Sequence, residues 1–103
     1  MLLEPPKTAQ VDPLLLPFLQ AADGEAEAAL ADLLTTEARP VIQAILRRDP
    51  LLDGADLEGE IFLCLIERLR RLRRDPGEDG IRDFRGYVAV VTYNVVSRHC
   101  RRR

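Results

Sequence analysis

The chain has 103 residues, the size of one domain, and its 47% hydrophobic and 31% charged residues are typical of a globular protein. That composition excludes a disordered chain, and two cysteines are too few for a disulfide scaffold. No apolar run approaches the roughly 20 residues that cross a bilayer, and residues 1–8 lack the basic and apolar regions of a secretory signal. We therefore expect a cytoplasmic protein whose Cys64 and Cys100 are free thiols.

The net charge of −2 conceals an uneven distribution along the chain. Residues 1–37 carry seven acids and one base, a net charge of −6, whereas residues 38–103 carry ten acids and fourteen bases, a net charge of +4. Within the second part, residues 82–103 carry six arginines and one acid, a net charge of +5. A basic end on an otherwise acidic chain favours an anionic partner such as nucleic acid, although a basic tail can also serve solubility alone.

The N-terminal end has two clear sequence signals. Residues 1–11 contain two prolines and no periodicity, so we expect a flexible arm there, followed by one domain over residues 12–103. Asp12 and Pro13 are typical of a helix start, because aspartate caps the first turn and proline has no N–H to lose at the first position. A short helix over residues 14–22 should follow.

A second helical pattern begins at Glu25 and is interrupted by a proline. Its apolar positions are Ala26, Ala29, Leu30, Leu33 and Leu34. Pro40 lacks the N–H of the helical hydrogen bond and clashes with the preceding turn, so it should end or kink the helix. The same periodicity continues over residues 41–46, and Asp49-Pro50 should stop it.

The longest predicted helix covers residues 56–74 and should be the central element. Its apolar stripe consists of Leu57, Ile61, Leu65, Leu69 and Leu72, widened by Phe62 and Ile66. A stripe of this width faces a core on more than one side, so we expect Phe62, Leu65 and Leu69 to be almost fully buried. Acids in the first turn and arginines in the last turn match the helix dipole.

The last segment, residues 84–100, carries two conflicting signals. Six β-branched residues between positions 88 and 96 favour a strand. No turn signal lies between Tyr87 and Arg98, however, and a strand of that length is unusual. A helical stripe is formed by Phe84, Tyr87, Val88, Val91 and Val95. Helix is therefore the better interpretation, and the predicted fold class is all-α, a compact bundle of three to five helices.

The sequence contains no pattern that predicts an enzyme, a metal site or a cofactor. His99 is the only histidine, and His99-Cys100 lacks the second pair of ligands that a zinc site needs. Cys64 lies among apolar residues, which favours a buried, inert thiol over a nucleophile paired with His99. Gly77 and Gly80 lack the Gly-Lys-Ser/Thr element of a phosphate loop. We expect no catalytic activity, no metal and no cofactor.

Three stretches, in this order, resemble the second conserved region of bacterial RNA polymerase sigma factors of the extracytoplasmic-function type. In residues 15–48, Asp23-Gly24, Ala29, Leu30, Leu33 and Ala38-Arg39-Pro40 stand in places similar to the family pattern. Residues 56–69 read DLEGEIFLCLIERL, close to the family's DLVQEVFLRLWRRL. Residues 84–103 read FRGYVAVVTYNVVSRHCRRR, close to FRAWLYRIARNLALDLLRRR. The similarity covers residues 14–103 and also favours a helix for the last stretch.

The resemblance implies a docking site for core RNA polymerase at the start of the 56–74 helix. In the family, this helix binds a coiled coil of the largest polymerase subunit through acidic and amide groups. Those groups correspond to Asp56 and Glu60, with Leu57 and Ile61 beside them, whereas the family's glutamine is Gly59. The alternative is that Asp56 only caps the helix and Glu60 is a solvated acid in its first turn.

The resemblance also implies binding of the promoter's minus-ten element as single-stranded DNA. The candidate residues on the last helix and the loop before it are Arg82, Arg85, Tyr93, Asn94, Arg98, Arg101 and Arg102. Tyr87 fits the apolar stripe and is better explained by core packing. Val90 and Tyr93 stand where the family is often basic, which weakens phosphate binding. Arg85 lies thirteen residues before Arg98, about 140° around a helix, so a basic strip has to wind around it.

The predicted function is therefore a sigma-like module of transcription initiation. Its expected partners are the largest subunit of core RNA polymerase and promoter DNA, with an anti-sigma factor as a further candidate. One alternative is a sigma-like protein-interaction domain that does not bind DNA, and another is an unrelated helical bundle with a solvated basic end. The family's second, helix-turn-helix domain is missing here, so we expect a piece of a longer protein, with a free-standing domain as the alternative.

Overall fold

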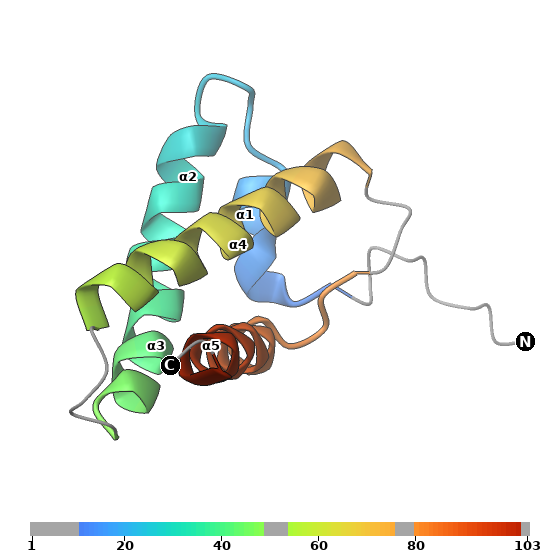
Figure 1. Ribbon diagram of the computed structural model, residues 1–103. Coiled ribbons are helices and arrows are strands. Elements are labelled where there is room, and N and C mark those ends of the chain that lie inside the picture. Colours follow the sequence, from blue (N-terminus) through green and yellow to red (C-terminus); the bar gives the residue numbers. More distant parts are fainter. Residues whose placement is uncertain (1–10, 49–53, 76–79, 102–103) are drawn as a thin grey trace, which may run out of the picture.

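The computed structural model describes residues 11–48, 54–75 and 80–101, and it confirms an all-α bundle (Figure 1). The elements in chain order are a 3-10 turn (Pro13–Leu15), α1 (Leu16–Leu19), α2 (Ala26–Leu33), a π-helical turn (Leu34–Ala38), α3 (Arg39–Leu46), α4 (Gly54–Arg74) and α5 (Phe84–Arg101). None of the helices formed by these residues is long and apolar enough to cross a membrane.

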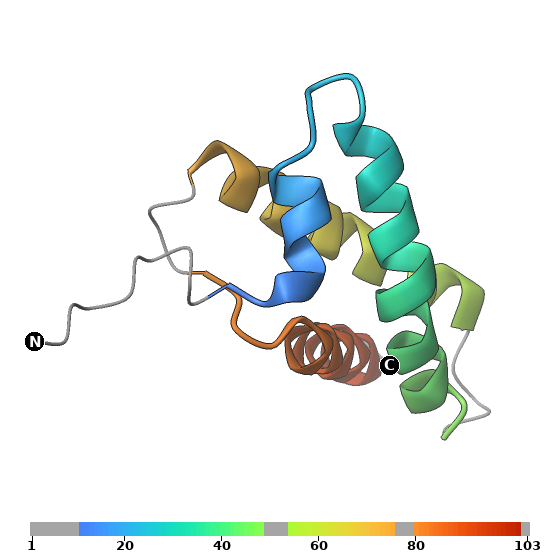
Figure 2. The same ribbon diagram turned by 180° about the vertical axis from the view of Figure 1, so that it is seen from behind.

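Helix α4 is the central element, because it packs against α1, α3 and α5. Helices α2 and α3 form one rod, and α4 runs diagonally across it. Helix α5, seen almost end-on in both views, packs against α3 and α4 (Figures 1 and 2). The predicted stripe is confirmed, since its five residues are at most 1% exposed: Leu57, Ile61, Leu65, Leu69 and Leu72. Phe62 was expected to be equally buried and is only half-buried, because it lies one residue off this stripe at the edge of the core.

The rod formed by α2 and α3 continues through Pro40, which was predicted to end or kink it. The backbone widens just before the proline into the π-helical turn, where the N–H of Arg39 donates to the carbonyl of Leu34 five residues earlier. Proline stands in the first turn of α3, where a missing N–H is tolerated. The interruption in the sequence is thus absorbed as a local change of helix type. The predicted stop at Asp49-Pro50 lies outside the described residues.

Asp12 joins the first helical turn of the domain to the start of its last helix. One carboxylate oxygen accepts a hydrogen bond from the N–H of Leu14 at 2.9 Å, which confirms the predicted helix start. The other accepts from the N–H of Phe84, the first residue of α5, at 2.7 Å. The backbone N–H of Asp12 also donates to the carbonyl of Ile81. Val11, which was assigned to the flexible arm, is buried in the core.

The segment with conflicting signals is helical, as the apolar stripe predicted. Its β-branched residues point largely inwards, and Val88, Thr92 and Val95 are at most 1% exposed. The buried hydroxyl of Thr92 donates to the carbonyl of Val88 at 2.7 Å, so no polar group is left unsatisfied there. Asp83 accepts a hydrogen bond from the N–H of Gly86 and caps the same helix end that Asp12 reaches. Packing therefore explains most of the β-branched residues, although Val90 is exposed.

We predict that replacing Asp12 destabilises the domain beyond the loss of an ordinary helix cap. Asp12→Ala removes the cap of the first turn and leaves the half-buried N–H of Phe84 without an acceptor, which together should lower the free energy of unfolding by about 2–4 kcal/mol. Asp12→Asn keeps one acceptor oxygen and should lose less. Urea unfolding measures both, with exposed Asp32→Asn as control. A loss below about 0.5 kcal/mol for the alanine variant would contradict the double cap.

Candidate protein- and nucleic-acid-binding surfaces

The predicted polymerase-binding residues divide into two exposed and two buried ones. Asp56 and Glu60 are exposed near the start of α4. Leu57 is 1% exposed and Ile61 is 0% exposed, so neither lies on a docking face. The correction follows from helical geometry, because positions 57 and 61 extend the same stripe that buries Leu65 against the core. Asp56 is also not the N-cap, since α4 already includes Gly54.

Sequence reasoning missed Leu63, the most exposed large apolar side chain in the described part of the chain. Its relative exposure is 65%, although it stands in the middle of α4. It shares one face of the helix with three exposed acids, at spacings of four, three and four residues: Asp56, Glu60, Leu63 and Glu67. We call these four residues the acidic stripe. The spacing was visible in the sequence, but only the burial of the core stripe shows that this face is the outer one.

Arg85, a predicted DNA-binding residue, is already paired with an acid of its own chain. Its guanidinium donates to the carboxylate of Glu37 in the π-helical turn, with the Nε atom at 3.0 Å. This hydrogen bond and the attraction between the two charges raise the pKa of Arg85 above its ordinary value. Arg85 therefore lies on the flank of α5 that faces α3, and a phosphate would have to replace Glu37.

Arg98 lies on the opposite flank of α5. Its guanidinium is 3.9 Å from the carboxylate of Glu60 on α4, and both side chains are about half exposed. Arg85 and Arg98 thus face different neighbouring helices, as the predicted angle between them requires. In the described residues, these two arginines do not form a continuous basic strip on one side of α5.

The outer face of α5 between these arginines is uncharged. Val90 is 56% exposed and Tyr93 is 49% exposed. The hydroxyl of Tyr93 accepts a hydrogen bond from Arg48 at 3.2 Å, which holds the ring towards α3. Asn94 is exposed and lines a shallow cleft between α4 and α5 with Arg98. The middle of this face therefore offers an aromatic ring and a side-chain amide but no charged group.

The remaining predicted DNA-binding residues lie at the two ends of α5. Arg82 is exposed in the segment before the helix. Arg101 is the last described residue of α5, and its side chain, like Arg102, lies outside what the structure describes. Tyr87 is half-buried and packs against the core, as predicted. The described residues contain no group of three or more acids, histidines and cysteines that could hold a metal ion.

Comparison with known proteins identifies no relative. A scan against models of protein families finds no match, and neither does a search of curated proteins or a search of solved structures.

Two leucines on opposite faces of α4 should differ strongly in how much their replacement by alanine destabilises the domain. Leu65→Ala leaves a cavity in the core and should lower the free energy of unfolding by about 2–5 kcal/mol. Leu63→Ala removes an exposed side chain and should change it by no more than about 0.5 kcal/mol. Thermal or urea unfolding of both variants makes the comparison. Equal losses would mean that the face assigned to the acidic stripe is not the outer one.

Proposed function

We propose that this chain is a sigma-factor-like module of transcription initiation that docks on core RNA polymerase through the acidic stripe of α4. The main support for this proposal is the exposure of Leu63 on the same helical face as Asp56 and Glu60. The opposite face of this helix is buried in the core, so the stripe is presented on a rigid support. The proposal places the chain in the cytoplasm, where the polymerase acts.

An exposed leucine among acids has the composition of a binding site for a basic, partly apolar helix. Burying Leu63 against a partner would contribute apolar contact, and the surrounding carboxylates would steer and orient basic side chains. Glu60 is about half exposed, which leaves it accessible to such a partner. Gly59 stands exposed between the acids, and a side chain added there meets open space. This position corresponds to the amide in the sigma-factor pattern.

The proposed function includes weak binding of melted promoter DNA by the outer face of α5. Tyr93 and Asn94 are exposed and supply a stacking ring and an amide. Arg85 and Arg98 could contact phosphates only by exchanging their partners Glu37 and Glu60. These ion pairs and the exposed Val90 favour a second candidate function, a sigma-like protein-interaction domain that does not bind DNA.

Polymerase docking should depend on the acids of the stripe. Asp56→Ala with Glu60→Ala should weaken capture of core RNA polymerase by roughly tenfold, because two steering charges at the interface are lost. Glu25→Ala with Asp32→Ala removes the same charge from α2 and serves as the matched control. Gly59→Gln should strengthen capture, whereas Gly59→Ala should only stabilise the helix by about 0.5–1 kcal/mol. Unchanged capture by the stripe variant, with the fold intact, would refute the docking site.

DNA binding should show the salt dependence of phosphate contacts. Four contacts predict a slope of log affinity against log salt of about −3 for a single strand, and a preference for single-stranded over duplex oligomers. Glu37→Gln should strengthen binding, because it releases Arg85, whereas Glu25→Gln makes the same charge change elsewhere. Fluorescence anisotropy across a salt series measures these values. Equal binding to both oligomers without a salt slope would leave the protein-interaction domain as the function.

A further inference from the structure

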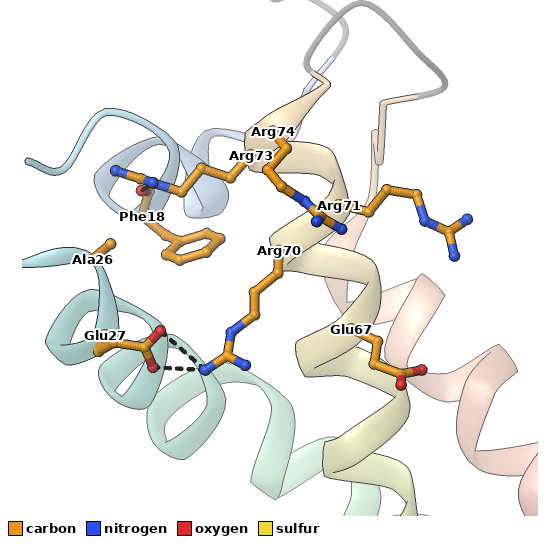
Figure 3. Close-up of a pocket in the computed structure, with 8 residues that line it drawn as sticks. All are labelled: Phe18, Ala26, Glu27, Glu67, Arg70, Arg71, Arg73 and Arg74. Atoms are coloured by element: carbon orange, nitrogen blue, oxygen red, sulfur yellow. Dashed lines mark hydrogen bonds and ion pairs between the residues drawn. The ribbon is translucent and has the colours of Figure 1, made fainter. Parts of the chain in front are cut away.

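Four arginines surround a cleft at the C-terminal end of α4, next to Glu67, the last residue of the acidic stripe. Arg70, Arg71, Arg73 and Arg74 line it together with Phe18, Ala26 and two acids, Glu27 and Glu67 (Figure 3). Its volume of about 480 Å³ lies within the range of roughly 300–1,000 Å³ that small-molecule sites occupy. The helix dipole accounts for some basic residues at this end, but it does not account for a cleft between them.

Arg73 has a structural role in this cleft. Its Nη2 atom donates to the carbonyl of Ala21 at 2.7 Å and to the carboxylate of Asp23 at 3.1 Å, and its Nε atom donates to the carbonyl of Phe18. The guanidinium also lies 5.9 Å from the centre of the Phe18 ring. These bonds satisfy carbonyls at the end of α1 and fix Arg73 along one wall of the cleft (Figure 3).

Arg70 is held much more weakly. One of its terminal nitrogens donates to both carboxylate oxygens of Glu27 on α2 at 3.0 Å. The two side chains are 54% and 70% exposed, and an ion pair with this exposure contributes little to stability. Figure 3 shows Arg70 reaching across the cleft towards Glu27. An anion with more charge than one carboxylate can therefore displace Glu27 from Arg70.

Arg71 and Arg74 are exposed, and although Glu67 lines the same cleft, it forms no ion pair with either of them. Within the described residues, neither makes an ion pair or a side-chain hydrogen bond. Arg70 and Arg74 stand four residues apart on one helical face, a spacing at which like charges repel. Arg71 extends from the other side of α4, at the rim of the cleft (Figure 3). A bound polyanion would replace this repulsion with attraction.

We propose that the cleft between Arg70 and Arg74 binds the phosphate groups of a polyanionic ligand. The planar guanidinium forms paired hydrogen bonds with phosphate oxygens, and the cleft offers two such groups about one helical turn apart. The phosphates come from a nucleoside polyphosphate or from a single-stranded nucleic acid, which share this chemistry. The site borders the acidic stripe at Glu67, but it binds through arginines and not through the acids of the stripe, so it does not rest on the proposed function.

The test uses the full 103-residue chain and two probes, inorganic pyrophosphate and a single-stranded thymidine oligomer. Titration followed by NMR of backbone and arginine N–H groups should shift signals of Arg70, Arg74 and their neighbours. Arg70→Gln with Arg74→Gln should weaken binding roughly tenfold, because charge-assisted hydrogen bonds are lost while Arg73 keeps its bonds to α1. Arg39→Gln with Arg47→Gln removes the same charge from α3 and should bind like the unaltered chain. Binding of the oligomer but not of pyrophosphate identifies nucleic acid as the source of the phosphates, and binding of pyrophosphate favours a nucleotide.

A second variant tests the same site by gain of binding. Glu27→Gln removes the carboxylate that competes for Arg70, so it should tighten pyrophosphate binding several-fold. Asp32→Asn changes the charge equally on the same helix, away from the cleft, and should have no such effect. The proposal is overturned if neither probe binds, or if the variant of Arg70 and Arg74 binds both probes as well as the control variant of Arg39 and Arg47 does.

Discussion

The carboxylate of Asp12 connects the first helical turn of the bundle to the start of its last helix. It accepts backbone hydrogen bonds from Leu14 and from Phe84, seventy-two residues further along the chain. The N-terminus of α5 is thereby fixed against the first turn of the domain. The backbone hydrogen bond from Asp12 to Ile81 adds a second link between the same two segments. Asp12 therefore fixes the point at which α5 begins, next to Arg82 and Arg85, whereas packing against α3 and α4 sets the direction of the helix.

The local part of the fold was readable from the sequence. Apolar spacing predicted α4 and its core stripe, and Asp12-Pro13 predicted the first helical turn. The second bond of Asp12 was not predictable, because it joins groups that only the tertiary structure brings together. The π-helical turn before Pro40 was missed for a related reason: proline forbids one hydrogen bond, but the surrounding core decides whether the helix ends or widens.

The candidate surfaces were predicted less well than the core. Leu57 and Ile61 were assigned to a partner although they belong to the buried stripe, and Leu63 was overlooked although its face is exposed. Motif similarity proposes a helix for a site, but packing decides which face of that helix is exposed. The pairing of Arg85 with Glu37 was likewise invisible, because the two residues lie forty-eight positions apart. Counting arginines therefore overestimated the charge that α5 offers to a phosphate.

Glu60 belongs to both surfaces of the proposed function. It is part of the acidic stripe of α4, and it is the acid that faces Arg98 on α5. A basic partner that engages Glu60 would release Arg98, and a phosphate that engages Arg98 would release Glu60. Linkage requires these two effects to be equal in free energy. Since the pair is 3.9 Å apart and about half exposed, the coupling is limited to about 1 kcal/mol or less. Docking would then favour DNA binding by a few-fold, a small bias that is set by one surface ion pair.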